Sequence, residues 1–153
     1  MHSKAGPTDP MDRAFAEATA AATRGEVPIG AAVVDAGGTV IAAAGNRVEA
    51  ERDPTAHAEL LALRAAAQIL GAARLTDCDL YVTLEPCPLC AAAIALYRVR
   101  RLYFGAYDPK GGGVEHGPRI FDQPTCNHRP EIYGGIRERE AAALLQDFFK
   151  ARR

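Results

Sequence analysis

The middle of the chain alternates between strand-like and helix-like segments, and this pattern limits the fold more than any other feature of the sequence. Two apolar, strand-like runs come first, at 29–35 and 39–44, and the Ala36-Gly37-Gly38 turn between them predicts an antiparallel hairpin. Helix-like and strand-like segments then alternate over 54–71, 79–84, 88–97 and 102–107. Because strands joined through a helix run parallel and connect by right-handed crossovers, the sequence predicts an α/β fold on a mixed sheet.

Further elements flank this central region. Apolar residues at helical spacing predict a helix over 11–24 and a last helix over 137–150. A short edge strand is expected at 131–133, after a long loop that contains glycine and proline. A chain of 153 residues has the length of one ordinary domain, so we expect a flexible N-terminal tail over 1–10 and a single domain over 11–153.

The composition is globular, and no apolar run approaches the roughly 18 residues that a membrane helix needs. The polar start of the chain, interrupted by Pro7 and Pro10, does not resemble a signal peptide, so a cytoplasmic protein is expected. The net charge of −1 and the pI of about 6.4 lack the basic excess of a typical nucleic-acid binder. Any RNA contact would therefore depend on local basic groups: Arg98, Arg100 and Arg101; Lys110; and the C-terminal Lys150, Arg152 and Arg153.

Two short motifs carry the chemistry. Pro86-Cys87-Pro88-Leu89-Cys90 places two thiols at positions i and i+3, and His57-Ala58-Glu59 precedes it in the chain. In a reducing compartment, cysteines serve as metal ligands or buried small residues rather than in disulfides. His57, Cys87 and Cys90 are ligands that zinc prefers, and a catalytic zinc site typically has three protein ligands and an open fourth position. The motifs therefore predict one zinc ion per chain.

The expected topology explains how the two motifs meet. Asp53 occupies an N-cap position and Pro54 the first position of the predicted helix, so His57 and Glu59 would lie in its first turn. The helices that carry the motifs both begin at the carboxyl ends of strands, where open α/β folds place their sites. Amide groups at both helix starts favour thiolates. Glu59 is not needed as a ligand and is expected to be the catalytic proton carrier.

The cysteine motif alone leaves other roles open. A lone Cys-x-x-Cys in a cytosolic protein is also typical of redox sites and of structural zinc ribbons. A four-cysteine structural site could recruit Cys78 and Cys126, but neither belongs to a second Cys-x-x-Cys pair. We expect these two cysteines to be buried free thiols. The combination of His-x-Glu with Pro-Cys-x-x-Cys favours a catalytic site over both alternatives.

His-x-Glu followed by Pro-Cys-x-x-Cys is the signature of zinc nucleobase deaminases. The chain resembles the bacterial tRNA-specific adenosine deaminases of this superfamily nearly from end to end. The segments that carry the resemblance are Glu26-Val27-Pro28-Ile29-Gly30-Ala31, Gly45-Asn46-Arg47, Asp53-Pro54-Thr55-Ala56-His57-Ala58-Glu59, Leu80-Tyr81-Val82-Thr83-Leu84-Glu85-Pro86-Cys87, Phe104-Gly105-Ala106, Asn127-His128-Arg129 and Leu144-Leu145-Gln146-Asp147-Phe148-Phe149.

This resemblance implies a three-layer αβα cytidine-deaminase-like fold, with helices on both faces of a mixed five-stranded sheet, assembled as a homodimer. It also implies hydrolytic deamination of adenosine to inosine at the wobble position of a tRNA anticodon stem-loop. In that reaction the base is flipped out, zinc-bound hydroxide attacks C6, and Glu59 is the proton shuttle. An alternative is a zinc deaminase of a free base or nucleoside, such as guanine or cytosine, which would share every zinc ligand.

The resemblance further implies contacts with the substrate outside the zinc site. Asn46 is expected to hydrogen-bond the base, the backbone amide of Ala58 to hold its reacting edge, and Asp108 to lie near the ribose-phosphate chain. Tyr107 departs from the family, where many members have a basic residue. The last helix is expected to turn Phe148 inward and to contact the anticodon loop through Phe149, Lys150, Arg152 and Arg153.

Overall fold

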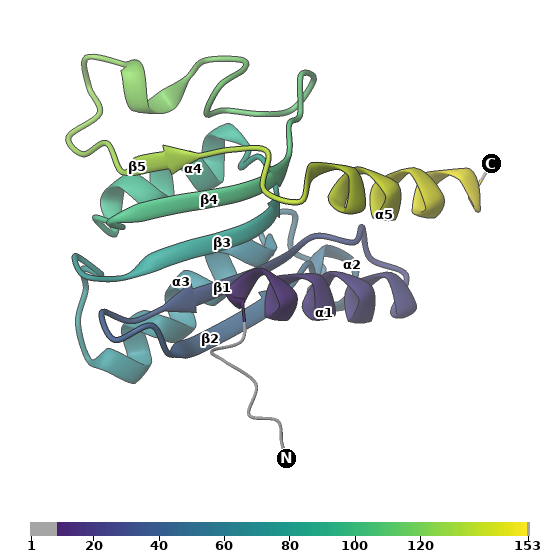
Figure 1. Ribbon diagram of the computed structural model, residues 1–153, viewed down its shortest axis with the longest axis horizontal. Coiled ribbons are helices and arrows are strands. Elements are labelled where there is room, and N and C mark those ends of the chain that lie inside the picture. Colours follow the sequence, from purple (N-terminus) through teal and green to yellow (C-terminus); the bar gives the residue numbers. More distant parts are fainter. Residues whose placement is uncertain (1–8, 153) are drawn as a thin grey trace.

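The computed structural model describes residues 9–152, which form a five-stranded sheet with helices on both faces (Figure 1). The strand order is β2-β1-β3-β4-β5. β1 pairs antiparallel with β2 and with β3, whereas β3, β4 and β5 pair in parallel. The strands are β1 (Gly30–Val34), β2 (Val40–Gly45), β3 (Asp79–Leu84), β4 (Arg101–Ala106) and β5 (Glu131–Tyr133). The predicted α/β fold on a mixed sheet is thus confirmed.

The helices form two layers around this sheet (Figure 1). One face is covered by α1 (Pro10–Thr23) and α5 (Glu138–Lys150), and the other by α3 (Ala58–Leu70) and α4 (Pro88–Leu96). The larger core cluster, under α3 and α4, includes the fully buried Leu63, Leu80, Ile94, Leu102 and Phe104. None of the helices within residues 9–152 is both long and apolar enough to cross a membrane.

The register of the strands brings the functional segments to one edge of the sheet. β2, β3 and β4 run in the same direction, and β1 lies antiparallel between β2 and β3. Gly30 pairs with Gly45, and Leu84 pairs with Ala106. The carboxyl ends of β2, β3 and β4 therefore lie at the same edge, where α3, α4 and the loop after β4 begin, as the sequence predicts.

Two glycines let α1 lie close against the hairpin. A Cβ atom at Gly30 would overlap the carbonyl oxygen of Ala14, and one at Gly45 would lie 2.6 Å from that of Glu17. The helix face above them is made of small buried side chains, among them Ala14 and Ala18. This close packing fixes the end of β2 and hence the position of Asn46, the next residue.

Two segments differ from the sequence-based expectation. Of the predicted tail, residues 1–8 lie outside the described part of the chain, whereas Asp9 caps α1 by accepting from the Met11 N–H, and Pro10 begins the helix. The predicted loop over 45–53 contains a one-turn helix, α2 (Val48–Glu51). The Glu26 carboxylate stabilises this turn by accepting from the backbone N–H groups of Glu49 (3.1 Å) and Ala50 (2.8 Å).

The start of α3 was also predicted wrongly. The Asp53 carboxylate accepts from the Thr55 N–H at 2.9 Å and from the Thr55 hydroxyl at 2.7 Å, which closes a local turn instead of capping a helix. The helix begins only at Ala58, and His57 is its N-cap residue. His57 and Glu59 still lie at the mouth of α3, because the shift moves the helix start toward them.

Candidate active site

The structure brings the three predicted zinc ligands together. His57 Nδ1 lies 3.5 Å from the Sγ atom of Cys87 and 3.4 Å from that of Cys90. A tetrahedral zinc ion with bonds of about 2.0 Å to nitrogen and about 2.3 Å to sulfur separates such ligand atoms by roughly 3.5 Å. All three ligand atoms lie within 4.8 Å of one another. The donor set and its spacing therefore fit a zinc ion with a fourth position open.

The starts of two helices position these ligands. His57 is the N-cap residue of α3, and Cys87 is the N-cap residue of α4, where Pro88 holds the first helical position. Cys90 follows within the first turn of α4 and is fully buried. The amide groups at both helix starts favour negative charge near the thiols. The predicted convergence of the two motifs at the mouths of two helices is confirmed.

The two thiols have opposite proton affinities. A hydrogen bond from Cys90, with further help from His57, lowers the pKa of Cys87 to about 4. The same hydrogen bond raises the pKa of Cys90, since the proton shared by the pair stays on Cys90. The pKa of His57 is raised, mainly by its hydrogen bond to Cys87. Cys87 is thus the more acidic thiol of the pair, and a zinc ion bound by both sulfur atoms would displace the proton from Cys90 as well.

Glu59 lies beside the ligands without being one of them. Its side chain belongs to the first turn of α3, and the residue is 4% exposed. Burial, assisted by the charge on Cys87, raises the pKa of Glu59 to about 7, although a hydrogen bond from its own backbone N–H and the nearby His57 and Cys90 act in the opposite direction. A carboxyl group that titrates near neutrality can both accept and donate a proton. This environment is suited to a general acid–base group.

Asn46 is held rigidly at the same edge of the sheet. Its N–H donates to the Ile29 carbonyl at 3.1 Å, and its own carbonyl accepts from Arg24 Nη2 at 3.0 Å. The side-chain oxygen accepts from the Ala58 N–H at 2.9 Å. The Ala58 amide, which was expected to hold the substrate, therefore positions Asn46. Within residues 9–152 no acceptor pairs with the Nδ2 group of Asn46, so this group can donate hydrogen bonds to a ligand.

A cleft of about 510 Å³ opens over His57 and Asn46. Its walls come from α2 and the segment before β1 and, on another side, from α5 through Phe148 and Arg152. Glu26 also lines it, and sequence reasoning gave this residue no role. In the sequence, the signal that could have identified Glu26 is a charged residue just before an apolar strand. Glu26 is buried in the fold, where its carboxylate accepts hydrogen bonds from the backbone of α2.

The C-terminal helix places its aromatic residues as predicted. Phe148 is buried, whereas Phe149 is 51% exposed. The Arg152 guanidinium stacks 3.5 Å above the Phe148 ring and donates to the Phe148 carbonyl, which directs it to the cleft. Lys150 is exposed, and Arg153 lies outside the described residues.

Asp108 follows β4 and lies at the same edge. Its carboxylate accepts from the N–H groups of Lys110 (3.2 Å) and Gly111 (2.9 Å), so it closes the turn that begins the next loop. The residue is half-buried, and its place near a bound ribose-phosphate chain stays a prediction.

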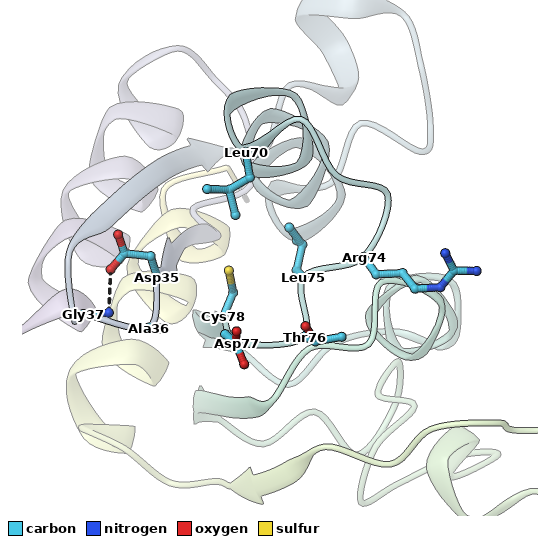
Figure 2. Close-up of a pocket in the computed structure, with 9 residues that line it drawn as sticks. All are labelled: Asp35, Ala36, Gly37, Leu70, Arg74, Leu75, Thr76, Asp77 and Cys78. Atoms are coloured by element: carbon cyan, nitrogen blue, oxygen red, sulfur yellow. Dashed lines mark hydrogen bonds between the residues drawn. The ribbon is translucent and has the colours of Figure 1, made fainter.

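Several residues that the sequence offered as candidates lie elsewhere. Cys78 is a buried free thiol that lines a pocket of about 290 Å³ between the end of β1 and the start of β3, the opposite edge of the sheet from the zinc ligands (Figure 2). Cys126 is a half-buried free thiol that donates to the His128 carbonyl. Arg100 pairs with Asp79 at 2.9 Å at the edge far from the site, so its charge is already neutralised.

Known proteins share both this fold and these motifs. The model of the cytidine and deoxycytidylate deaminase zinc-binding region matches residues 7–106. A tRNA-specific adenosine deaminase of Agrobacterium fabrum is 54% identical over 143 residues, which cover 94% of this chain and 93% of that protein.

Solved structures give the same relationship. A structure from a study of A-to-I editing by tRNA:A34 deaminases superposes with a TM-score of 0.87 at 55% identity, covering 89% of this chain and 98% of that chain. A guanine deaminase from Nitrosomonas europaea is similar at a TM-score of 0.79 and 26% identity, with 96% of this chain and 86% of that chain covered. The chain therefore belongs to the cytidine and deoxycytidylate deaminase family of zinc enzymes and, within it, to the tRNA-specific adenosine deaminases.

Proposed function

We propose that this protein hydrolyses adenosine to inosine at the wobble position of a tRNA anticodon. The observation that carries the proposal is the 54% identity with a tRNA-specific adenosine deaminase over nearly the whole of both chains. The site geometry agrees with it, because the buried Glu59 carboxyl group lies beside the zinc ligand set, and one of these ligands, His57, lines the same cleft as Asn46. Since the proposed substrate is tRNA, we place the enzyme in the cytoplasm.

The reaction replaces the C6 amino group of adenine by an oxygen atom from water and releases ammonia. When bound, the zinc ion supplies a Lewis acid that lowers the pKa of water. In this proposal Glu59 accepts one proton from the water as its oxygen forms a bond to C6, and delivers that proton to ring N1. The same carboxyl group then takes the remaining proton from the hydroxyl group at C6 and delivers it to the amino group, so that the C6–N6 bond breaks, ammonia leaves and the C6 carbonyl forms. A pKa of about 7 suits both directions of transfer.

Binding of the flipped base is assigned to Asn46. Its Nδ2 group can donate to a purine acceptor, while the Ala58 N–H keeps its carbonyl oxygen in place. This arrangement assigns Ala58 an indirect part in substrate binding. At the rim of the cleft, Arg152 and the exposed Phe149 and Lys150 offer charge and a stacking surface to the anticodon loop, and Arg153 extends the basic end of the chain.

A deaminase of free guanine or cytosine is the second candidate. The fold likeness to a guanine deaminase and the net charge of −1 favour this candidate. However, the guanine deaminase is only 26% identical to this chain, against 54% for the tRNA-specific adenosine deaminase of Agrobacterium fabrum. Ammonia release separates the two activities when the purified enzyme is given a wobble-adenosine stem-loop, free guanine or free cytosine. We expect ammonia from the stem-loop; release confined to the free bases would contradict the proposal.

We also propose that two copies associate through the outer face of α3 and α4. Leu96 is 70% exposed, beside a mainly apolar groove of about 450 Å³ that Leu60, Ala67, Ala93 and Tyr97 help to line. A second copy presents the same side chain and the same groove, so a symmetric interface can bury both leucines at once. Because α4 also carries Cys90, this interface would support the helix that holds the metal.

A further inference from the structure

The loop after β4 is built around one carboxylate that the reaction does not use. Glu85 directly follows β3, and its N–H donates to the Ala106 carbonyl at 2.8 Å, which joins the carboxyl ends of β3 and β4. The Glu85 side chain is 0% exposed. A buried carboxylate is costly unless it is fully hydrogen-bonded, so the groups that surround it define its role.

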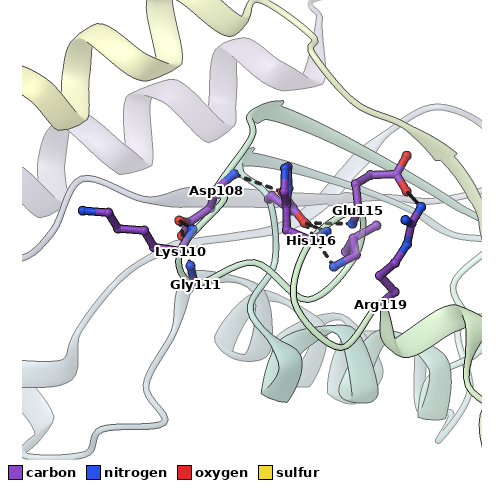
Figure 3. Close-up of polar contacts among 8 residues, drawn as sticks. Asp108, Lys110, Gly111, Glu115, His116 and Arg119 are labelled. Carbon is purple, nitrogen blue, oxygen red and sulfur yellow. Dashed lines mark hydrogen bonds and ion pairs between the residues drawn. The ribbon is translucent and has the colours of Figure 1, made fainter.

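Glu85 receives five hydrogen bonds from the loop over 108–116. Its Oε1 atom accepts from the Asp108 N–H at 3.0 Å and from His116 Nδ1 at 2.8 Å. Its Oε2 atom accepts from the N–H groups of Val114 (3.1 Å), Glu115 (2.8 Å) and His116 (3.1 Å). Figure 3 shows Asp108 at one end of this network and Glu115 and His116 at the other. One side chain thus holds both ends of the loop.

Two glycines allow the loop to close over this carboxylate and the zinc-binding turn. A Cβ atom at Gly112 would lie 2.5 Å from Glu85 Oε2, and one at Gly113 would lie 2.6 Å from the Pro88 nitrogen. The Gly113 N–H donates to the Pro86 carbonyl at 2.8 Å. The loop therefore leans directly on the segment that contains Cys87, at the edge of the sheet where the cleft opens.

The outer side of this loop carries groups that suit RNA. Tyr107 and Lys110 are exposed, and the Tyr107 ring packs edge-on against His116 with 6.0 Å between ring centroids. Aromatic rings that stack on bases and cations that contact phosphates are the usual means of binding single-stranded RNA. A fixed backbone would hold these groups in place before the RNA binds, which lowers the entropy cost of binding.

We infer that Glu85, together with the His116 Nδ1–H, is a positioning residue that holds the loop over 108–116 in the shape that binds the RNA substrate. The inference rests on the proposed function, because it assigns the loop to the tRNA side of the cleft. Glu85 does not contact the reacting atoms. Its effect on the reaction passes through the backbone that it anchors.

The substitution Glu85→Gln tests this role with almost no change of volume. An amide has only one acceptor atom, so whichever way Gln turns, its NH₂ group faces backbone N–H donors that lose their partner. We expect KM for a wobble-adenosine stem-loop to rise about tenfold, since a buried donor without a partner is costly, while kcat stays within about twofold. Zinc content should remain one ion per chain. Exchange of the Asp108, Val114, Glu115 and His116 amides, followed by NMR, should become faster.

Two further variants separate positioning from general stability. His116→Asn keeps a donor near the place of Nδ1, so its KM should stay close to that of the wild type. His116→Leu removes this donor and should raise KM. Asp79→Asn removes a carboxylate that is also buried but pairs with Arg100 at the opposite edge of the sheet. We expect this control to lower the melting temperature without changing KM. If Glu85→Gln does not fold, His116→Leu, which removes one of the five hydrogen bonds, serves the same comparison.

An unchanged KM in Glu85→Gln, or a loss confined to kcat, would overturn the inference. If the proposed function is wrong, a different result is expected, because the wild-type enzyme would then form no inosine in the stem-loop. In that case the amide exchange still decides the anchoring: equal protection of the four amides in wild type and Glu85→Gln contradicts it.

Discussion

Glu59 shares the mouth of α3 with His57 but has a different chemical environment. Its carboxyl group is buried and outside the ligand set, so replacing it should remove proton transfer and leave the metal in place. We expect Glu59→Gln to lower turnover by about 100-fold or more, because general acid–base catalysis contributes factors of that size. Zinc measured by elemental analysis should stay near one ion per chain. Turnover close to wild type would exclude Glu59 as the proton carrier.

The role of Asn46 can be tested by a substitution that changes only its hydrogen-bonding group. Asn46→Asp keeps an oxygen that can accept from the Ala58 N–H, but it replaces the Nδ2 donor by a second acceptor. If Asn46 donates to the base, KM for the stem-loop should rise roughly tenfold or more, because a polar group of the substrate loses its partner. The melting temperature should change little. An unchanged KM would show that the base does not depend on this donor.

The single-residue predictions differed in how far the sequence could support them. Ligand identity follows from residue type and spacing, because zinc accepts few side chains and the helix starts bring them together. The partner of the Ala58 amide could not be predicted, since Asn46 reaches it from twelve positions earlier through the packing of the hairpin. Glu85 belongs to the segment over 80–87 that resembles the family, but nothing in that segment indicates that its five donors come from the loop after β4.

At the scale of elements, α5 connects the cleft to the basic end of the chain. Truncation after Phe148 removes Phe149, Lys150 and the arginines beyond them, but none of the zinc ligands. We expect weaker stem-loop binding and a shallower dependence of log Kd on log salt concentration, by about 0.7 for each phosphate that the shorter chain no longer neutralises. Equal affinities of the truncated and complete chains across several salt concentrations would refute the tail assignment.

The starts of α3 and α4 show what local sequence can and cannot fix. Pro88 begins α4 as predicted, because proline lacks only a bond that the first helical residue does not make. Asp53-Pro54 offered the same signal for α3, but the Asp53 carboxylate forms hydrogen bonds with Thr55 instead. A helix capped by Asp53 and a turn closed by Asp53 are both favourable for this local sequence. The turn is the one that accompanies the position of His57 beside the two thiols.

At the scale of the whole molecule, the proposed dimer depends on the exposed face of α4. Leu96→Glu would place a charge in the interface while leaving the core of the domain untouched, since this side chain points outward. We expect sedimentation to show a dimer for the wild type and a monomer for the variant at the same concentration. A wild type that sediments as a monomer, or a variant that stays dimeric, would contradict this interface.

The global arrangement was more predictable than many of its details. Parallel direction of β2, β3 and β4 follows from their helical connections, and it alone brings the two motifs to one edge. The place of β1 between β2 and β3, and the wrapping of the loop around Glu85, depend on pairings between distant parts of the chain. Periodicity within a segment carries no information about such pairings.

The most direct test of the central claim is to locate the product in RNA. Purified protein is incubated with an anticodon stem-loop that has adenosine at the wobble position and further adenosines elsewhere, and each nucleoside is then identified by mass spectrometry. We expect inosine at the wobble position alone, and none with the Glu59→Gln variant. Inosine spread over all loop adenosines, or an intact stem-loop together with ammonia release from free guanine or cytosine, would contradict the account.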